Sequence, residues 1–205
     1  MSGAGNVVAL TSPEISVKLF VDDHSAVNPQ ALIPVFHRWI KEGVLEDELM
    51  IDVAIYEHVP QGPGIILVCD KAHYYFDVRH NRWGLRYRGR REARATGGEA
   101  VTRAFASALK AASLLENDPT LNGQYTFRTD EVEFGVYDRL RAPSDASTLE
   151  AVRPALAATV EALWGARPTL ELQSGPKEPF MVSVRNAASP SVGELWGKLS
   201  AAVAG

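Results

Sequence analysis

Hydrophobic and polar side chains alternate along several stretches of the chain, a pattern typical of β-strands with one buried face. Residues 15–22 show it most clearly: every second residue from Ile15 is apolar, and Ser16 and Lys18 lie on the opposite side. An unbroken apolar run at residues 65–69 is typical of a central strand covered on both faces. The other stretches that predict strands are residues 49–59, 73–79, 83–88, 125–128, 132–140, 169–173 and 180–185.

Apolar residues recur at helical spacing in four further segments. These segments are residues 34–43, 99–116, 149–164 and 192–203. Gly43 is expected to end the first helix as a left-handed cap, and Pro154 predicts a kink in the third helix or a later start. Strands joined by short turns, with helices between them, predict an α+β fold: a largely antiparallel sheet with helices on one face.

Two stretches of the chain share one order of elements: strand, proline-containing helix, strand, Gly-Pro turn, strand. They are residues 15–70 and residues 131–186. An internal βαββ duplication and coincidence are both compatible with this order, because residue identity between the two is low. The order predicts an N-terminal βαββ module with an extra basic hairpin in residues 1–95. Residues 96–205 then hold a connecting helix, the second module and a C-terminal helix, and the two parts form one compact unit.

This duplicated order resembles the architecture of the vicinal-oxygen-chelate superfamily, in which paired βαβββ modules curl around a metal ion. The resemblance spans the two stretches and carries no sequence motif. Members of that superfamily take His and Glu ligands from both modules. In this chain the second module holds Glu133 and Glu171 on predicted strands but no histidine.

The overall composition is typical of a soluble globular chain. Of the 205 residues, 46% are apolar and 22% are charged. No stretch approaches the roughly 18 uninterrupted apolar residues of a membrane span, and the first residues lack the positive charge of a secretory signal. The single cysteine, Cys69, excludes an internal disulfide and fits a reducing compartment. We expect a cytoplasmic protein with no membrane partner.

The common signatures of nucleotide, dinucleotide, serine-hydrolase, zinc-protease and dithiol chemistry are missing from the sequence. All five histidines lie in the first eighty residues near several aspartates, and two His with a carboxylate suit a divalent metal. No tight His spacing supports such a site, and Cys69 in an apolar strand is expected to be an inert thiol. We assign no catalytic residue and expect no metal or other cofactor.

Charge is distributed unevenly along the chain, although the net charge is only −4. The segment from Arg79 to Arg94 has seven arginines and one acid, which makes it +6 and leaves −10 for the rest. Such a stripe suits an acidic surface, on this chain or on a partner, or a small anion. Nucleic acid is a less favoured partner, because the aromatic residues of the hairpin alternate with its arginines and face the core. The arginines expected to contact a partner are Arg79, Arg82, Arg86, Arg88, Arg90 and Arg91.

The polar sheet face is the second candidate surface. If the helices cover the apolar face, the other face presents mixed aromatic and polar groups, which suit a cup for a small ligand. A dimer face and an ordinary solvated sheet remain the alternatives. The residues expected to bind a ligand are Lys18, Asp52, Tyr56, His58 and Arg185.

Two functional hypotheses follow from these features. The first is a non-catalytic binding or assembly protein that self-associates and uses its arginine-rich hairpin to contact an acidic partner or an anion. The alternative is a metal-dependent or small-ligand enzyme of vicinal-oxygen-chelate-like architecture, with a pocket around His58.

Overall fold

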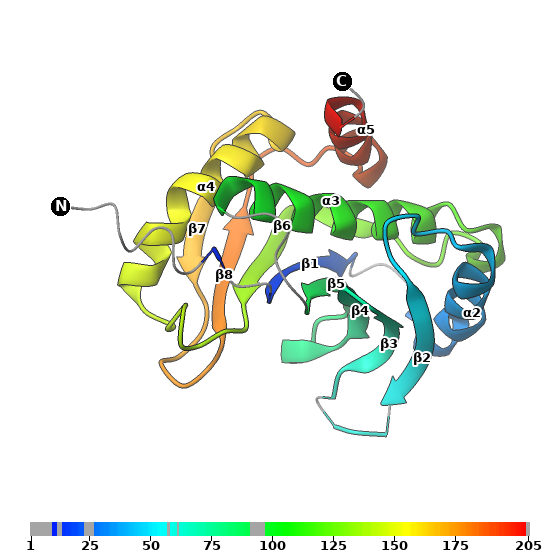
Figure 1. The fold of residues 1–205 in the computed structure, drawn as a ribbon. Helices are drawn as coiled ribbons and strands as arrows, with labels where there is room; N and C mark the ends of the chain where they lie inside the picture. Colours follow the sequence, from blue (N-terminus) through cyan, green and yellow to red (C-terminus); the bar gives the residue numbers. More distant parts are fainter. Residues whose placement is uncertain are drawn as a thin grey trace.

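The structure is a computed structural model that describes residues 10–11, 14–22, 27–56, 58–60, 62–90 and 97–203. Its centre is one antiparallel sheet with the strand order β2-β3-β4-β5-β1-β6-β8-β7 (Figure 1). The strands are β1 (Ile15–Val21), β2 (Met50–Tyr56), β3 (Gly64–Cys69), β4 (Ala72–Asp77), β5 (Gly84–Gly89), β6 (Phe127–Val136), β7 (Thr169–Leu172) and β8 (Phe180–Arg185).

The helices of the described residues cover one face of this sheet (Figure 1). They are α2 (Leu32–Glu42), α3 (Gly97–Glu116), α4 (Ala146–Trp164) and α5 (Val192–Val203). Short 3₁₀ turns lie at η1 (Pro29–Ala31), η2 (Arg79–Asn81) and η3 (Pro119–Leu121). The predicted α+β class with an antiparallel sheet is therefore confirmed. None of the helices among the described residues is both long enough and apolar enough to cross a membrane.

The core forms where the apolar side of each strand meets the apolar side of each helix. On β1, Val17 and Leu19 have no exposed surface and pack under α3. On α2 the buried residues are Leu32, Val35, Phe36 and Trp39, the i, i+3, i+4, i+7 spacing of a helix with one apolar face. Gly43 ends α2 with φ 66°, the left-handed conformation that its position in the sequence predicted.

The helix α4 begins earlier than its apolar pattern predicted and continues through Pro154. Asp145 caps its first turn by accepting a hydrogen bond from the Thr148 backbone N–H at 2.8 Å. At the other end, the Trp164 indole donates to the Thr129 carbonyl at 2.8 Å. This cap and this anchor fix both ends of the helix over the sheet.

The two stretches that share an order in the sequence meet at the centre of the sheet. In each, a central strand (β1 or β6) leads into a helix and then to an edge strand (β2 or β7). The first stretch is followed by β4 and β5, which lie between β3 and β1 in the sheet. The pairing of β1 with β6 joins both halves into one continuous sheet. Internal duplication and the division at residue 95 remain predictions.

Strand β2 departs from the alternation expected for residues 49–59. Its register with β3 shifts between Met50 and Asp52, so that Met50 is buried while Ile51 is exposed. A bulge of this kind moves the following side chains to the other face relative to a regular strand. The strand ends at Tyr56, which leaves His58 in the turn beyond it.

Candidate functional site: an arginine-lined cavity on the polar face

A row of charged side chains crosses the sheet on the face opposite the described helices, called the polar face below. The register pairs Lys18 on β1 with Arg86 on β5 and with Glu133 on β6. These residues alternate with core residues along their strands, so their side chains share the polar face. Two cations directly opposite one another repel, and this pair therefore requires nearby acids.

Asp77, at the end of β4, supplies the bridging carboxylate. Its Oδ1 accepts from Lys18 Nζ at 2.5 Å, and its Oδ2 accepts from Arg86 Nε at 2.9 Å. Glu133 Oε1 accepts from Arg86 Nη1 at 2.8 Å. The side chains of Lys18 and Arg86 are only 1% and 2% exposed. The four residues form a neutral ion network that is withdrawn from water, the buried ion network named below.

The network changes the proton affinity of its members. Burial lowers the pKa of Lys18 despite the attraction of Asp77. Burial alone would raise the pKa of Asp77, but Arg86 and Lys18 hold the pKa of that carboxyl below its usual value. Burial opposes the charge of Arg86 as well, yet Asp77 keeps the guanidinium pKa above its ordinary value. Asp77 and Arg86 are thus held in their charged forms.

Beside this network lies a cavity of about 450 Å³, called the arginine cavity below. Its wall and rim include Tyr75, Arg79, His80, Arg86, Arg88 and Tyr137. The β2–β3 loop and the β7–β8 loop, which hang below the sheet in Figure 1, contribute Pro63 and Glu178 to the rim. Residues far apart in the sequence therefore converge on one hollow of the polar face.

Two donor atoms of the cavity's arginines have no hydrogen-bond partner among the described residues. They are Nη2 of Arg86 and Nε of Arg88, and both atoms are buried. Arg86 is held by Asp77 and Glu133 through its other nitrogens. Arg88 is held by Glu14, which accepts from Nη2 at 2.6 Å, and its guanidinium lies 3.8 Å from the Tyr137 ring centre. Buried donors without an acceptor are costly and uncommon.

The acids at the cavity already have partners. Asp77 belongs to the buried ion network, and Glu178 Oε2 accepts from the Gly175 backbone N–H at 2.8 Å. Arg79 reaches the Tyr137 hydroxyl at 3.4 Å. Three arginines and two acids line the cavity, and Asp77 is already neutralised in the buried ion network, which favours a ligand that accepts hydrogen bonds.

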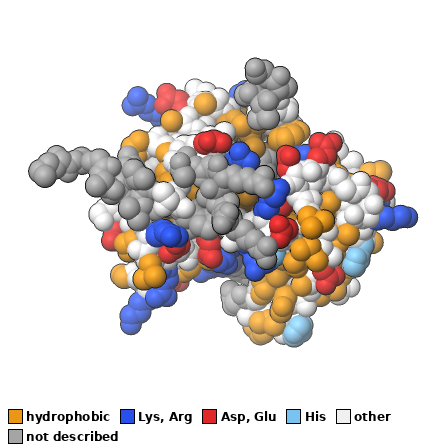
Figure 2. Space-filling view, viewed as in Figure 1, with side chains coloured by type: hydrophobic (Ala, Val, Ile, Leu, Met, Phe, Trp, Pro, Cys, Tyr) orange, Lys and Arg blue, Asp and Glu red, His pale blue; other side chains and the backbone are white. Residues whose placement is uncertain are grey.

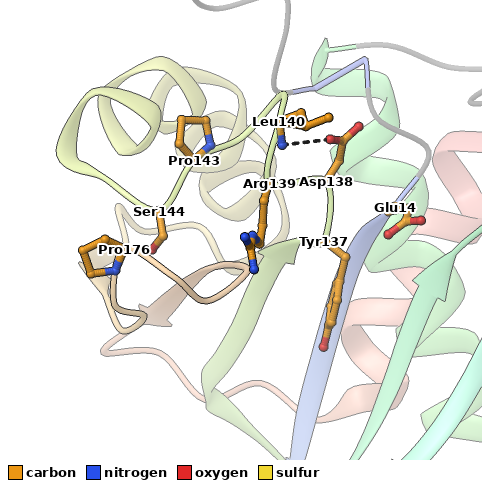
Figure 3. Close-up of a pocket in the computed structure, with 8 residues that line it drawn as sticks. All are labelled: Glu14, Tyr137, Asp138, Arg139, Leu140, Pro143, Ser144 and Pro176. Carbon is orange, nitrogen blue, oxygen red and sulfur yellow. Dashed lines mark hydrogen bonds between the residues drawn. The ribbon is translucent and has the colours of Figure 1, made fainter.

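A second hollow of about 440 Å³ adjoins the first and shares Tyr137 with it (Figure 3). Figure 3 shows Arg139 between the loops that carry Ser144 and Pro176. Arg139 donates to the Lys177 carbonyl at 3.0 Å, and Asp138 accepts from the Leu140 backbone N–H at 3.1 Å. Arg139 is thus bound to the β7–β8 loop and Asp138 to its own turn, so the second hollow is a weaker candidate than the arginine cavity.

The residues predicted to bind a ligand do not come together. Lys18 lies in the buried ion network at the centre of the sheet. Asp52 and Tyr56 are exposed on edge strand β2, with His58 in the turn beyond, its ring 6.4 Å from that of Tyr56. Arg185, on β8, is 57% exposed and pairs with Glu131 and Glu171. In the strand order, β2 and β8 are six strands apart, roughly 25–30 Å.

The hairpin arginines are engaged largely with acids of the same chain. Arg82 makes a bidentate pair with Glu131 at 3.1 and 3.0 Å, and its guanidinium stacks 3.6 Å from the Phe20 ring centre. Arg90 is exposed. Arg91 lies outside the described residues. Of the six predicted contact arginines, Arg79, Arg86 and Arg88 line the cavity.

Metal ligands do not gather in the part of the chain that the structure describes. No group of three or more His, Cys, Asp or Glu side chains there is arranged to hold a metal ion. Glu133 is occupied by Arg86, and Glu171 faces Arg185. Burial and the neighbouring Arg90 lower the pKa of His73, whose Nδ1 accepts from the Cys69 backbone N–H at 3.1 Å.

Asp77, Glu133 and Tyr137 belong to this site, although no pattern in the sequence marked them as its members. Asp77 and Arg86 lie on the polar side of one hairpin, and this was visible in the alternation of residues 73–88. Glu133 and Tyr137 come from β6 and the residue after it, and their place depends on the pairing of β6 with β1. Comparison of the chain with models of known protein families and with curated proteins gives no match.

Proposed function

We propose that this protein is a non-catalytic binding protein that receives a small carboxylate- or phosphate-bearing anion in the arginine cavity. The observation that carries the proposal is Arg86, which lines the cavity and whose buried Nη2 has no hydrogen-bond partner among the described residues. The hairpin was expected to meet an acidic partner or an anion. Because Arg82, Arg86 and Arg88 are already paired with acids of this chain, the free donors suit a small ligand better than a broad acidic surface.

The chemistry of the free donors supports an anionic ligand. Arg86 and Arg88 both line the cavity, and guanidinium groups match the spaced oxygens of a carboxylate or phosphate. Tyr75 and Tyr137 add aromatic walls, and their hydroxyl groups can donate or accept. The cavity volume lies within the range of pockets for small molecules.

The anchoring of Arg86 supports affinity as well. Its Nε and Nη1 are fixed by Asp77 and Glu133, so that Nη2 is already oriented before a ligand arrives. Arg88 is fixed in the same way by Glu14 and by the face of Tyr137. Preorganised donors lose little side-chain entropy on binding, and this lowers the cost of association.

Isothermal titration calorimetry with inorganic phosphate and with acetate, at constant ionic strength, tests the proposal. We expect saturable 1:1 binding of at least one probe with a Kd on the order of 1 mM or tighter. The Arg88→Met variant removes the free Nε–H without touching Asp77 or Glu133. It should weaken binding by roughly tenfold or more, the loss of one charge-assisted hydrogen bond.

The matched control is Arg90→Met, which deletes the same charge two residues away at an exposed position outside the cavity. This variant should bind the probe as the unchanged protein does. Absence of binding for both probes would mean that water alone satisfies the free donors, and it would overturn the proposal. Equal weakening by both variants would also overturn it, because binding would then follow net charge rather than the cavity.

A further inference from the structure

The outer edge of the sheet at β2 carries most of the large exposed hydrophobic side chains among the described residues. They are Leu49 at 68%, Ile51 at 56%, Ile55 at 45%, Tyr56 at 42% and Val59 at 41%. In Figure 2, hydrophobic side chains gather at the lower right of the molecule, where β2 lies in Figure 1. Side chains of these sizes expose on the order of a few hundred Å², the size of the largest apolar patch on a typical monomer, and such patches are often functional.

The backbone of this edge is also available for pairing. Strand β2 stands last in the strand order, so only its β3 side is paired within the sheet. The Val53 N–H points away from β3 and is bound by the carboxylate of the adjacent Asp52 at 2.8 Å. Since donor and acceptor groups alternate in direction along a strand, Val53 and Ile55 both direct theirs outward. An edge strand with apolar side chains is a template for another strand, whose pairing would replace the local bond from the Val53 N–H to Asp52.

We infer that the β2 edge binds a second copy of this chain, with β2 paired antiparallel to its counterpart about a twofold axis at Ala54. The regular part of the strand, after the register shift, runs from Asp52 to Tyr56, and Ala54 is its midpoint. The inference rests on the edge alone and is independent of the anion proposed for the arginine cavity.

The self-paired register is complementary in size and charge. Val53 lies opposite the second copy's Ile55, and these residues exchange the outward backbone hydrogen bonds. Asp52, the only charged residue of the strand, lies opposite the second copy's Tyr56, so a carboxylate meets a hydroxyl donor and not another carboxylate. Ala54 meets itself at the closest approach of the two backbones, where a small side chain fits.

The same twofold covers the rest of the apolar edge. Leu49 and Ile51 precede the regular strand, whereas Val59 follows it, so an antiparallel pair brings the start of one copy beside the end of the other. Leu49 of one copy then lies towards Val59 of the other, so apolar groups meet at the two ends of the contact. A partner of different sequence would need its own matching strand, whereas a second copy supplies one by symmetry.

Sedimentation equilibrium over about 1–100 μM protein, a range that covers weak homodimers, tests the association. The chain has a mass of 22.3 kDa, and we expect the fitted mass to rise towards twice that value with concentration. Ile55→Lys places a charge in the contact, and Val53→Pro removes an outward N–H that β3 does not use; each should keep the chain monomeric. Leu140→Lys changes an equally apolar side chain, 97% exposed elsewhere, and should leave the mass unchanged.

A cysteine scan tests the register. Ala54→Cys should form a disulfide-linked dimer under mild oxidation, because position 54 faces itself at a Cα separation that a disulfide spans. Val53→Cys, one residue away, should cross-link far less. The native Cys69 is buried and does not compete. A chain that stays monomeric throughout the concentration range, or a dimer that Ile55→Lys leaves intact, would overturn the inference. So would a dimer that Val53→Cys cross-links as well as Ala54→Cys does.

Discussion

Replacing Arg86 with Met is the most informative perturbation of the buried ion network. Met fills a similar volume but leaves Glu133 without its buried partner and leaves Asp77 with Lys18 alone. Removing one member of a buried ion pair costs about 3–5 kcal/mol. Because Asp77 keeps Lys18, we place the loss at about 3 kcal/mol, the lower end of that range. For a chain of this length that loss corresponds to a fall in Tm of about 6–12 °C.

The pH dependence of this loss identifies its cause. In the unchanged protein Arg86 and Lys18 hold the folded-state pKa of Asp77 below its ordinary value. Asp77 therefore contributes stability at neutral pH that is lost as the pH falls through the folded-state pKa. Without Arg86, burial favours the protonated form of Asp77. Lowering the pH then removes the poorly compensated buried charge, and the variant is destabilised less. The difference in unfolding free energy between the two proteins should be largest near pH 7 and should shrink below about pH 4.

Thermal unfolding followed by circular dichroism, together with urea titration at pH 7 and about pH 3, measures both quantities. Arg185→Met is the matched control, because Arg185 is 57% exposed and its ion pairs are longer than 3.4 Å. Exposed pairs contribute at most about 1 kcal/mol. If Arg86→Met destabilised the protein no more than this control does, the network would not be a buried ionic unit, and the reasoning would be refuted.

Three further predictions concern single positions. Burial, with Glu48 nearby, raises the pKa of Cys69 to about 12. The thiol should therefore resist Ellman's reagent at pH 8 until denaturant is added. Rapid reaction of the folded protein would contradict this. Gly64→Ala should lower the Tm sharply, because Gly64 has φ +66° and an added Cβ would meet the Phe76 carbonyl oxygen. Gly193 lies in a helix with open space around its Cα, so Gly193→Ala should not lower the Tm. Asp145→Ala should cost about 1 kcal/mol through the lost α4 cap, measured by urea unfolding; an unchanged midpoint would show that the cap contributes nothing.

Local patterns of the sequence were sufficient for most of the fold. The alternation in residues 15–22 and the i, i+3, i+4, i+7 spacing of α2 follow from the burial of one face, and the glycine after α2 has the predicted conformation. Two details depended on tertiary contacts. The two strands predicted within residues 125–140 are a single strand, β6 (Phe127–Val136), because it pairs with β1 and, in its second half, with β8. The bulge between Met50 and Asp52 buries Met50 and exposes Ile51, the reverse of the alternation predicted at the start of β2.

Less of the candidate site than of the fold could be predicted from the sequence. Lys18, Arg86 and Arg88 were correctly assigned to the polar sides of their strands, but the sequence gives no strand order. Without that order, Asp52 and Arg185 look like neighbours of Lys18, although they lie towards opposite edges of the sheet. The acids that neutralise the hairpin come from β4, β6 and the segment before β1, and they pair with three of the segment's seven arginines, Arg82, Arg86 and Arg88.

Anion binding in the arginine cavity is tested most directly by the side-chain ¹⁵N–¹H spectrum of the arginine Nε groups during a phosphate titration. The Arg88 Nε–H has no acceptor in the arginine cavity, so a bound anion must change its environment. We expect a saturable shift of the Arg88 Nε–H signal, whereas the Nε–H signal of Arg153, on the exposed side of α4, should not shift. Phosphate that leaves the Arg88 signal in place, or that shifts both signals alike, would contradict it.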